Sequence, residues 1–338
     1  MAQGSSRTVT MADVARHAGV SAATVSRALS GTRPMSPEIR SKVVEAAEEL
    51  GYRVNLVGRM LRQRRSATAG LIVPDLDNPF FCALAQHLSR TFVPSGLDLL
   101  IFSADSNLDT ELRGVQSFID RQVDALVLIP FHEEESSGNV AVATGSVVTI
   151  QLDRRVPESD AHFVGCDNSH GMHLIRQHVS ENVDTERQPV IFVGGDEISS
   201  SGKERLEGFQ REFGTEALAL NGSFDATWGI SAAREILDRG FRSGTIVAAA
   251  DVIALGITSH LHAQGLRVPE DFRVIGFDGV GVSHLAHPTL TTVRQPVEAM
   301  SRAIVSIVGS EEVGDTQTIR LEPELVVGES SPSTAEGG

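Results

Sequence analysis

The sequence predicts two parts of different fold class: an N-terminal all-α head with a helix-turn-helix, and a larger α/β core with parallel sheets. The head is expected because residues 8–54 hold short apolar-periodic segments bounded by Gly, Ser and Pro, which begin and end helices. The core is expected because the remaining chain alternates Val-, Ile- and Leu-rich runs with amphipathic helical segments. The formal charge also changes sign between the two parts.

Residues 1–66 carry a net charge of +6, from eleven Lys and Arg and five Asp and Glu. The whole chain carries −15, so the remainder carries −21. A basic head on an acidic body is typical of a protein whose head meets phosphate while its body does not.

The two cysteines, Cys82 and Cys166, offer neither a disulfide framework nor the spacing of a metal site, as expected in a reducing cytoplasm. No apolar run approaches the roughly 20 residues of a membrane span. Residues 1–11 lack the apolar stretch of a signal peptide. We therefore expect a cytoplasmic protein without a membrane partner.

The first predicted helix covers residues 11–18. Thr10 and Asp13, three residues apart, form a capping-box-like start, and Gly19 ends the helix because glycine adopts left-handed backbone readily. A second helix is expected over residues 22–29. Two helices joined by such a tight turn match a helix-turn-helix, whose second helix enters the major groove of DNA.

The second helix carries side chains suited to DNA. Three hydroxyls can bond phosphates: Ser21, Thr24 and Ser26. Arg27 can reach a guanine edge or a phosphate, whereas Ala22 and Ala23 offer only methyl groups. Base readout should therefore depend on Arg27 and on DNA shape. A generic three-helix bundle, completed by a helix from Pro37 towards Gly51, is the alternative that these side chains disfavour.

Residues 55–66 join the head to the core. The amphipathic stretch 55–62 is too short for a stable isolated helix, and Gly58 weakens it by about 1 kcal/mol relative to alanine. From the residues alone, a plain linker is the favoured prediction.

Eight runs are candidates for buried strands of the core: residues 70–74, 97–103, 125–130, 147–153, 163–167, 189–195, 245–251 and 273–278. Amphipathic helices are expected between them, for example over 110–121, 171–179, 203–213 and 229–239. This alternation predicts parallel sheets covered on both faces, and the number of strands favours two lobes. Ligands of such folds bind at the carboxyl ends of the strands, here in the cleft between the lobes.

Residues 10–62 read TMADVARHAGVSAATVSRALSGTRPMSPEIRSKVVEAAEELGYRVNLVGRMLR. The pieces AGVSxxTVSR and LGYxxN within this segment are highly specific. On these residues, the head closely resembles the DNA-binding head of the lac repressor (LacI/GalR) family.

The resemblance implies which residues meet DNA. Ala22 and Ala23 match the positions that choose the operator sequence, and Tyr52 and Asn55 match positions that approach the DNA backbone. Residues 55–62 would then be a hinge helix that orders on the operator, with Leu61 wedged into a minor-groove step. The candidate DNA-binding residues are Thr10, Ser21, Ala22, Ala23, Thr24, Ser26, Arg27, Tyr52, Asn55 and Leu61.

The resemblance continues through the core in the segments VPDLDNPFF, LDRR, CDNSHG, RLEGF, GLRVPEDFRVIGFDG and PTLTTVRQPVEAM. It implies a two-lobed, periplasmic-binding-protein-like core over residues 67–330. The N-lobe would comprise about 67–166 and the C-lobe about 167–293, each completed by a late return of the chain. The polar segment 331–338 is expected to be a disordered tail.

Five residues match effector-binding positions of the family: Phe81, Asp153, Arg205, Phe224 and Asp278. Phe224 stands where an aromatic ring commonly stacks on a sugar. The family pattern also breaks, because Ala250 replaces a pocket amide and Gly279 replaces an aspartate. Both changes remove hydrogen-bonding capacity and disfavour a plain sugar as the ligand.

Other chemistries find little support. His132 beside Glu133–Glu135 is interpreted as a solvated charge run, and four histidines without partners at ligand spacing are expected on the surface: His162, His170, His173 and His178. No GxGxxG precedes a helix and no GxSxG is present. Asp153 and Asp278 suit ligand hydroxyl groups as well as catalysis. We expect no enzyme, no cofactor and no metal.

The resemblance implies a transcriptional repressor that binds a pseudo-palindromic operator as a homodimer. A small molecule between the lobes, a sugar or related metabolite, would control operator affinity allosterically. Two alternatives remain open: the effector is a partner protein, or the chain is a cytoplasmic solute-binding protein.

Overall fold

The computed structural model describes residues 9–30, 35–52, 66–185, 187–310 and 315–333. The chain divides into two units, Met1–Ser66 and Ala67–Gly338, here called the head and the body. The expected hinge over residues 55–62, with Asn55 and Leu61, lies outside the described residues.

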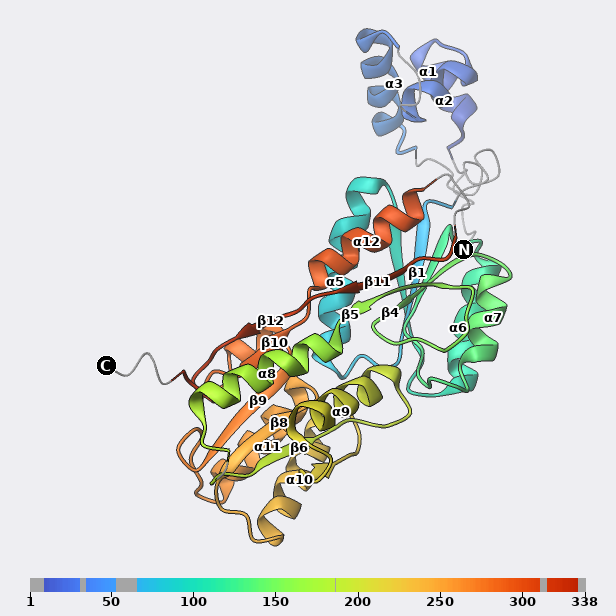
Figure 1. The fold of residues 1–338 in the computed structure, drawn as a ribbon. Coiled ribbons are helices and arrows are strands. Elements are labelled where there is room, and N and C mark those ends of the chain that lie inside the picture. Colours follow the sequence, from blue (N-terminus) through green and yellow to red (C-terminus); the bar gives the residue numbers. More distant parts are fainter. Residues whose placement is uncertain (1–8, 31–34, 53–65, 186, 311–314, 334–338) are drawn as a thin grey trace, which may run out of the picture. The chain divides into compact units, whose positions relative to one another are not determined.

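In its described residues, the head has three helices (Figure 1): α1 Met11–Ala18, α2 Ala22–Ser30 and α3 Pro37–Glu49. The Thr10 side chain accepts a hydrogen bond from the Asp13 backbone while the Asp13 carboxylate accepts one from Thr10 N at 3.0 Å, so the predicted capping box forms. Gly19 follows α1 with φ 66°. An apolar core joins the helices: Val14, Ala15, Ala18, Val25, Ala28, Val43, Ala46 and Ala47. The helix-turn-helix prediction is confirmed.

The described residues of the body form two six-stranded sheets, one in each lobe (Figure 1). The N-lobe sheet is wholly parallel, with the strand order β11-β5-β4-β3-β1-β2. The bounds are β1 Thr68–Val73, β2 Asp98–Ser103, β3 Ala125–Leu128, β4 Val148–Leu152, β5 His162–Cys166 and β11 Thr318–Leu321. Helices α5 and α12 pack together on one face and α6 and α7 cover the other: α5 Pro79–Phe92, α6 Leu108–Asp120, α7 Ser137–Thr144 and α12 Val297–Gly309. A short 3-10 helix, Val93–Ser95, follows α5.

The C-lobe sheet has the order β12-β10-β9-β8-β6-β7 and is parallel except for β12, which pairs antiparallel with β10. Its bounds are β6 Val190–Val193, β7 Ala219–Leu220, β8 Gly244–Ala248, β9 Phe272–Asp278, β10 Thr291–Arg294 and β12 Glu324–Val326. Helices α8 and α9 cover one face, and α10 and α11 the other: α8 Asn168–Asn182, α9 Ser200–Phe213, α10 Ala226–Asp238 and α11 Asp251–Ala263. A 3-10 turn, Gly281–His284, follows β9.

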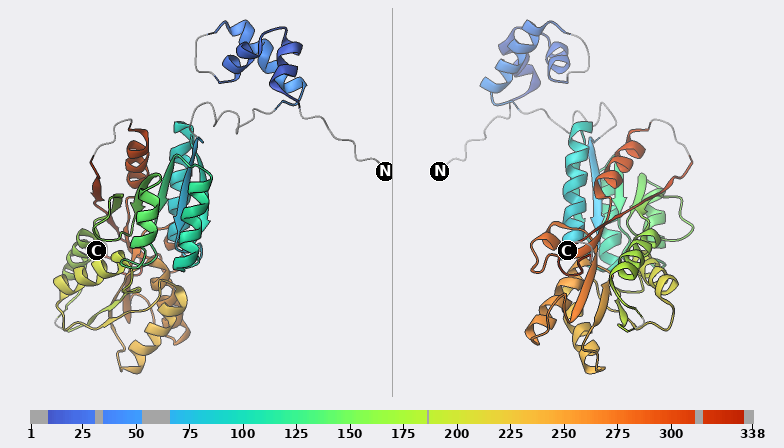
Figure 2. Two further views of the ribbon diagram at one scale, coloured as in Figure 1. Left: turned by 90° about the vertical axis from the view of Figure 1, so that its right-hand side faces the viewer. Right: turned by 60° about the vertical axis from the view of Figure 1, so that its left-hand side comes forward.

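The chain passes between the lobes three times: after β5, between β10 and α12, and between β11 and β12. Both views of Figure 2 show the last of these, where the chain from β11 to β12 runs from one lobe into the other. Each sheet is therefore completed by a late strand. The predicted two-lobed α/β class with parallel sheets is confirmed.

One predicted buried strand is not buried. Residues 97–103 give β2, which lies at the edge of the N-lobe sheet, and Leu100 and Ile101 are 37% and 48% exposed. Apolar composition alone does not distinguish a central strand from an apolar edge strand, because both read as continuous hydrophobic runs.

The packed body extends past residue 330, the end predicted from the sequence. Ser331 is fully buried, and its carbonyl accepts hydrogen bonds from Thr291 Oγ1 at 2.9 Å and from His178 Nε2, also at 2.9 Å. The tail expected from residue 331 onward was therefore started too early. His178 is 5% exposed, so its expected place on the surface was wrong.

Candidate DNA-binding face and inter-lobe site

The N-terminal end of α2 presents short side chains to solvent. Ala22 and Ala23 are exposed, and Arg27 is exposed one turn further along the same helix. Ser21 caps α2, since its hydroxyl accepts a hydrogen bond from Thr24 N at 3.1 Å. The Ser21 and Thr24 hydroxyls are also 2.9 Å apart. This end of α2 therefore has the geometry of a recognition helix: small at its tip, with a cation behind it.

Other predicted DNA-binding residues have structural partners in the head. The Thr10 hydroxyl donates to Asp13 Oδ2 at 2.6 Å and so serves the start of α1. Ser26 and Tyr52 are half-buried, and the Tyr52 ring packs against the head core. Their contacts with DNA remain predictions, as do those of Asn55 and Leu61.

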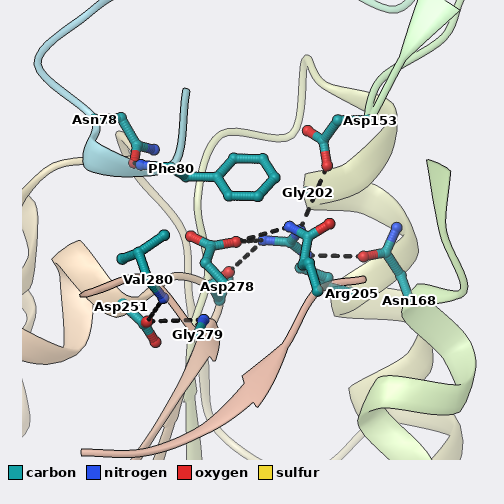
Figure 3. Close-up of polar contacts among 12 residues, drawn as sticks. Asn78, Phe80, Asp153, Asn168, Gly202, Arg205, Asp251, Asp278, Gly279 and Val280 are labelled. Carbon is teal, nitrogen blue, oxygen red and sulfur yellow. Dashed lines mark hydrogen bonds and ion pairs between the residues drawn. The ribbon is translucent and has the colours of Figure 1, made fainter. Parts of the chain in front are cut away.

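Charged residues from both lobes meet between the sheets (Figure 3). Asp153 follows β4 of the N-lobe, Asp278 ends β9 of the C-lobe, and Arg205 comes from the second turn of α9. Each is at most 5% exposed. Both carboxylates stand at the carboxyl ends of parallel strands, where this class of fold binds ligands. We call these three residues and their direct partners the junction site.

Arg205 is the centre of the junction site. Three hydrogen bonds hold its guanidinium: Nε to Asn168 Oδ1 (2.9 Å), Nη1 to Ala249 O (2.7 Å) and Nη1 to Asp278 Oδ1 (3.4 Å). Its Nη2 lies 3.9 Å from Asp153 Oδ1 across the lobes, and its Cζ lies 4.0 Å from the centre of the Phe277 ring. The arginine is thus fixed from the C-lobe and reaches towards the N-lobe.

Asp278 combines an ion pair with deep burial. Besides Arg205, it accepts a hydrogen bond from Gln295 Nε2 at 2.9 Å. Burial raises the pKa of Asp278 to about 8 and the neighbouring Asp251 adds to this, while Arg205 opposes it. The shared cation of Arg205 and the hydrogen bond from Gln295 therefore compensate a carboxyl group that burial alone would disfavour as a carboxylate.

Asp251 has a structural role. Its carboxylate accepts from four donors: Gly279 N (2.9 Å), Val280 N (3.1 Å), the Ser283 hydroxyl and the Thr292 hydroxyl (2.6 Å to Oδ1). Burial raises the pKa of Asp251 to about 6, and these hydrogen bonds work in the opposite direction. The residue fixes the loop that follows β9 and so orients Asp278.

Polar atoms that make no hydrogen bond to the described residues lie at the junction site. Asp153 Oδ1 and Gln295 Oε1 are buried and accept no hydrogen bond from any described residue. Burial raises the pKa of Asp153, although Arg205 counteracts it. Asp153 and Asp278 also hold left-handed backbone, with φ 62° and 120°. Such strain costs about 1–3 kcal/mol per residue and persists mainly at functional sites.

Phe81 and Phe224 are brought together through Arg154. This arginine is 5% exposed, and its Cζ lies 5.6 Å from the centre of the Phe81 ring and 5.3 Å from that of Phe224. Its Nε has no hydrogen-bond partner among the described residues and lies 3.9 Å from Asp153 Oδ2. A cation held by two ring faces occupies the place where Phe224 was expected to stack on a ligand.

The two departures from the family pattern have different structural settings. Ala250 is fully buried and precedes α11 without a side-chain cap, so an amide is missing there. Gly279 has φ 68°, and a Cβ on it would lie 2.5 Å from Arg294 Cα. An aspartate at position 279 is therefore incompatible with this backbone, whereas an amide at position 250 is absent for no reason that the structure supplies.

Arg154, Gln295 and Asn168 also belong to the site, although they were not among the residues predicted from the sequence. All three lie in segments that carry the family resemblance: LDRR, PTLTTVRQPVEAM and CDNSHG. Each also follows the carboxyl end of a strand: Arg154 follows β4, Gln295 follows β10, and Asn168 follows β5 at the start of α8. Because ligands of this class of fold bind at those strand ends, this position was the signal that could have identified them.

Within the ranges that the structure describes, no three His, Cys, Asp or Glu side chains come together as a metal site. The same residues include no helix with the length and apolarity to cross a membrane.

Residues 10–55 match the family described as "Bacterial regulatory proteins, lacI family", and residues 183–331 match a "Periplasmic binding protein-like domain". The "HTH-type transcriptional regulator AscG" of Escherichia coli K12 is 32% identical over 305 residues, which are 88% of this chain and 90% of that protein. The "HTH-type transcriptional regulator CelR" of Thermobifida fusca is 30% identical over 340 residues, with 96% and 98% covered. The "Ribose operon repressor" of Escherichia coli K12 is 26% identical, with 94% and 98% covered.

Solved structures share the fold. The lac repressor dimer bound to operator and the anti-inducer ONPF superposes with a TM-score of 0.82 at 23% identity, covering 96% of this chain and 100% of that one. A complex of the transcriptional regulator CelR with cellobiose gives 0.69 at 29% identity, covering 95% and 99%.

Proposed function

Because the chain belongs to the lacI family of bacterial regulatory proteins, we propose that it represses transcription by binding a pseudo-palindromic operator through α2. The exposed Ala22 and Ala23 would pack on thymine methyl groups, and Arg27 would bond a guanine edge or a phosphate. The head carries a net charge of +6 and the rest of the chain −21. The electrostatic potential therefore attracts the DNA phosphates to the head and repels them from the body.

The effector is a small polyhydroxylated molecule, carbohydrate-like, held between the lobes. The observation that carries this proposal is a set of buried polar atoms that make no hydrogen bond to any described residue: Asp153 Oδ1, Gln295 Oε1 and Arg154 Nε. A hydroxyl group both donates and accepts, so neighbouring hydroxyls of one ring can satisfy all three atoms. Phe81 and Phe224 would stack on the apolar faces of such a ring once Arg154 turns aside.

The repressor is a homodimer, since a pseudo-palindromic operator requires two heads related by a two-fold axis. The apolar edge strand β2, with Leu100 and Ile101 exposed, suits an interface with a second copy. Ile101→Asp would then weaken the dimer in analytical ultracentrifugation, whereas Val148→Asp, at a similarly exposed valine of β4, would not. The regulator acts in the cytoplasm, where its DNA lies, and it is no enzyme: the carboxyl groups of Asp153 and Asp278 bind the effector.

Two measurements on the full chain test the proposal. Operator fragments selected from random duplexes should bind with a Kd that rises steeply with salt, because phosphate contacts release counterions. A thermal-shift screen against pentoses, hexoses, sugar phosphates and nucleobases should find a compound that stabilises by about 2.7 kcal/mol at 100 times its Kd. Asp153→Asn should abolish that shift, and Asp160→Asn, an exposed carboxylate of the same loop, should preserve it.

A chain that selects no duplex at low salt would contradict the repressor proposal and favour a cytoplasmic solute-binding protein. Operator binding without any hit in the small-molecule screen would contradict the carbohydrate effector and favour a partner protein as the effector.

A further inference from the structure

The acidic loop His132-Glu133-Glu134-Glu135 lies between β3 and α7 of the N-lobe. Its sequence alone suggested a solvated charge run. In the structure, Glu133 is instead paired across the lobes with Lys203 of α9, and only 24% of its side chain is exposed. The function proposed above does not use this contact.

The loop is held in one shape from the N-lobe side. The fully buried carboxylate of Glu111 accepts hydrogen bonds from Phe131 N and Asn139 Nδ2, both at 2.8 Å. His132 Nδ1 accepts two backbone N–H groups of the loop: Glu134 N at 3.1 Å and Glu135 N at 3.2 Å. Glu133 is therefore presented to the C-lobe by a fixed turn rather than by a loose chain.

Two backbone N–H groups of the N-lobe also donate across the lobes. Glu133 N donates to Ile198 O at 2.7 Å, and Arg155 N donates to Ser200 Oγ at 2.9 Å. Both acceptors precede Lys203 by a few residues, in the segment that starts α9. Neither contact lies at one of the three chain crossings.

Three successive residues of α9 contact three different parts of the protein. Lys203 pairs with Glu133, Glu204 pairs with Arg320 of β11 at 2.6 Å, and Arg205 enters the junction site. Because one rigid helix carries all three side chains, a rotation of the C-lobe that opens the junction site must also separate Lys203 from Glu133.

We propose that Glu133, Lys203 and the hydrogen bond from Glu133 N to Ile198 O form a latch that holds the two lobes closed. The latch restrains the separation of the two lobes on the side away from the three chain crossings. It needs no ligand, because both partners belong to the protein. Lys203 faces Glu133, Glu134 and Glu207, so the lysine sits in an acidic field that retains its charge. Since its side chain is 39% exposed, salt screens the pair.

The amides of Glu133 and Arg155 report on the latch directly, because each donates across the lobes. The exchange rates of these two amides are measured by hydrogen exchange on the full-length protein without ligand. Lys203→Gln should speed exchange of both amides by about 2–5-fold, the effect of a partly exposed ion pair. Lys203→Arg, which keeps the positive charge, should retain most of the protection. The matched control, Arg239→Gln, breaks the exposed Arg239–Glu235 pair within α10 and should leave both amides unchanged.

Unchanged exchange of the two amides in Lys203→Gln would overturn the proposal. So would faster exchange spread equally over β1, β3 and β8, since that pattern means global destabilisation. None of these outcomes depends on DNA or an effector, so the latch can fail while the repressor function stands, and the reverse.

Discussion

The head and the body place their polar groups in opposite ways. The head core is entirely apolar, and the described residues of the head include no buried polar side chain. The body buries many, and at its centre Asp153, Arg205 and Asp278 are almost without solvent access. The head therefore carries its polar and charged side chains on the surface that is available to DNA, whereas the body carries many of them between its two lobes.

In the head, this difference separates the residues that bind from those that stabilise the fold. In the body, the same buried residues serve both purposes. An exposed side chain such as Arg27 can be changed without disturbing a core, and under the proposed function its contribution is expected in DNA binding. A buried charge is compensated by its partners before any ligand binds. Removing one partner leaves the other charges buried without compensation, which lowers the stability of the fold. Substitutions in the two regions should consequently differ in which measurement they change.

The largest effect is expected for Arg205→Ala. It leaves Asp278 and Asp153 buried without their shared cation, which costs about 3–5 kcal/mol in a buried ion pair. Urea unfolding of the body should show this loss. Arg211→Ala on the same helix is the control, because Arg211 is exposed to solvent and should stay within about 0.5–1 kcal/mol of the parent. Equal losses in the two variants would contradict the compensated-charge account.

The second prediction concerns Arg27→Ala, which should lower operator affinity by about 1–3 kcal/mol. Because Arg27 is exposed, the unfolding temperature should not change. Fluorescence anisotropy with the selected operator measures the affinity across a range of salt concentrations. Arg27→Lys separates two roles: retained affinity indicates a phosphate contact, whereas a loss as large as that of alanine indicates a guanine contact. An unchanged affinity in both variants would remove Arg27 from the interface.

The contrast between the regions also explains what the sequence could predict. The head helices were predictable because their signals are local: the Thr10–Asp13 box, Gly19 and the cap at Ser21 each act within four residues. The α/β class was predictable for a similar reason, since buried parallel strands read as apolar runs along the chain. In both cases the pattern and the structure lie on the same short segment.

Pairings between distant segments were not predictable from the residues alone. The exposed edge strand β2, the buried His178 beside Ser331, and Arg154 between two rings each depend on a partner far away in the sequence. The family resemblance named Asp153, Arg205 and Asp278, which the structure does bring together. It did not reveal that Arg154 stands between Phe81 and Phe224, because that contact combines three separate segments.

A third, smaller effect would sharpen the comparison within the head. Thr10→Ala removes the capping box and should destabilise α1 by about 0.5–2 kcal/mol. Hydrogen exchange of the α1 amides measures this loss in the full chain. Thr10→Ser is the control, because a serine hydroxyl caps equally well. If Thr10→Ala weakens operator binding but leaves α1 protection unchanged, Thr10 acts on DNA rather than on the fold.

The smallest effect is expected at the C-terminal end of the body. Burial lowers the pKa of His178, whereas the hydrogen bond to Ser331 opposes this shift and Arg273 adds to it. The folded state then binds a proton less readily than the unfolded state, so the contribution of His178 is present above about pH 6.5 and is lost as the pH falls below that value. The hydrogen bond from His178 Nε2 to the Ser331 carbonyl contributes about 0.5–1.5 kcal/mol. Urea unfolding at several pH values should therefore show a loss of stability at acidic pH that is smaller in His178→Phe. If His178→Phe kept the same pH profile as the parent, protonation of the buried histidine would not be coupled to folding.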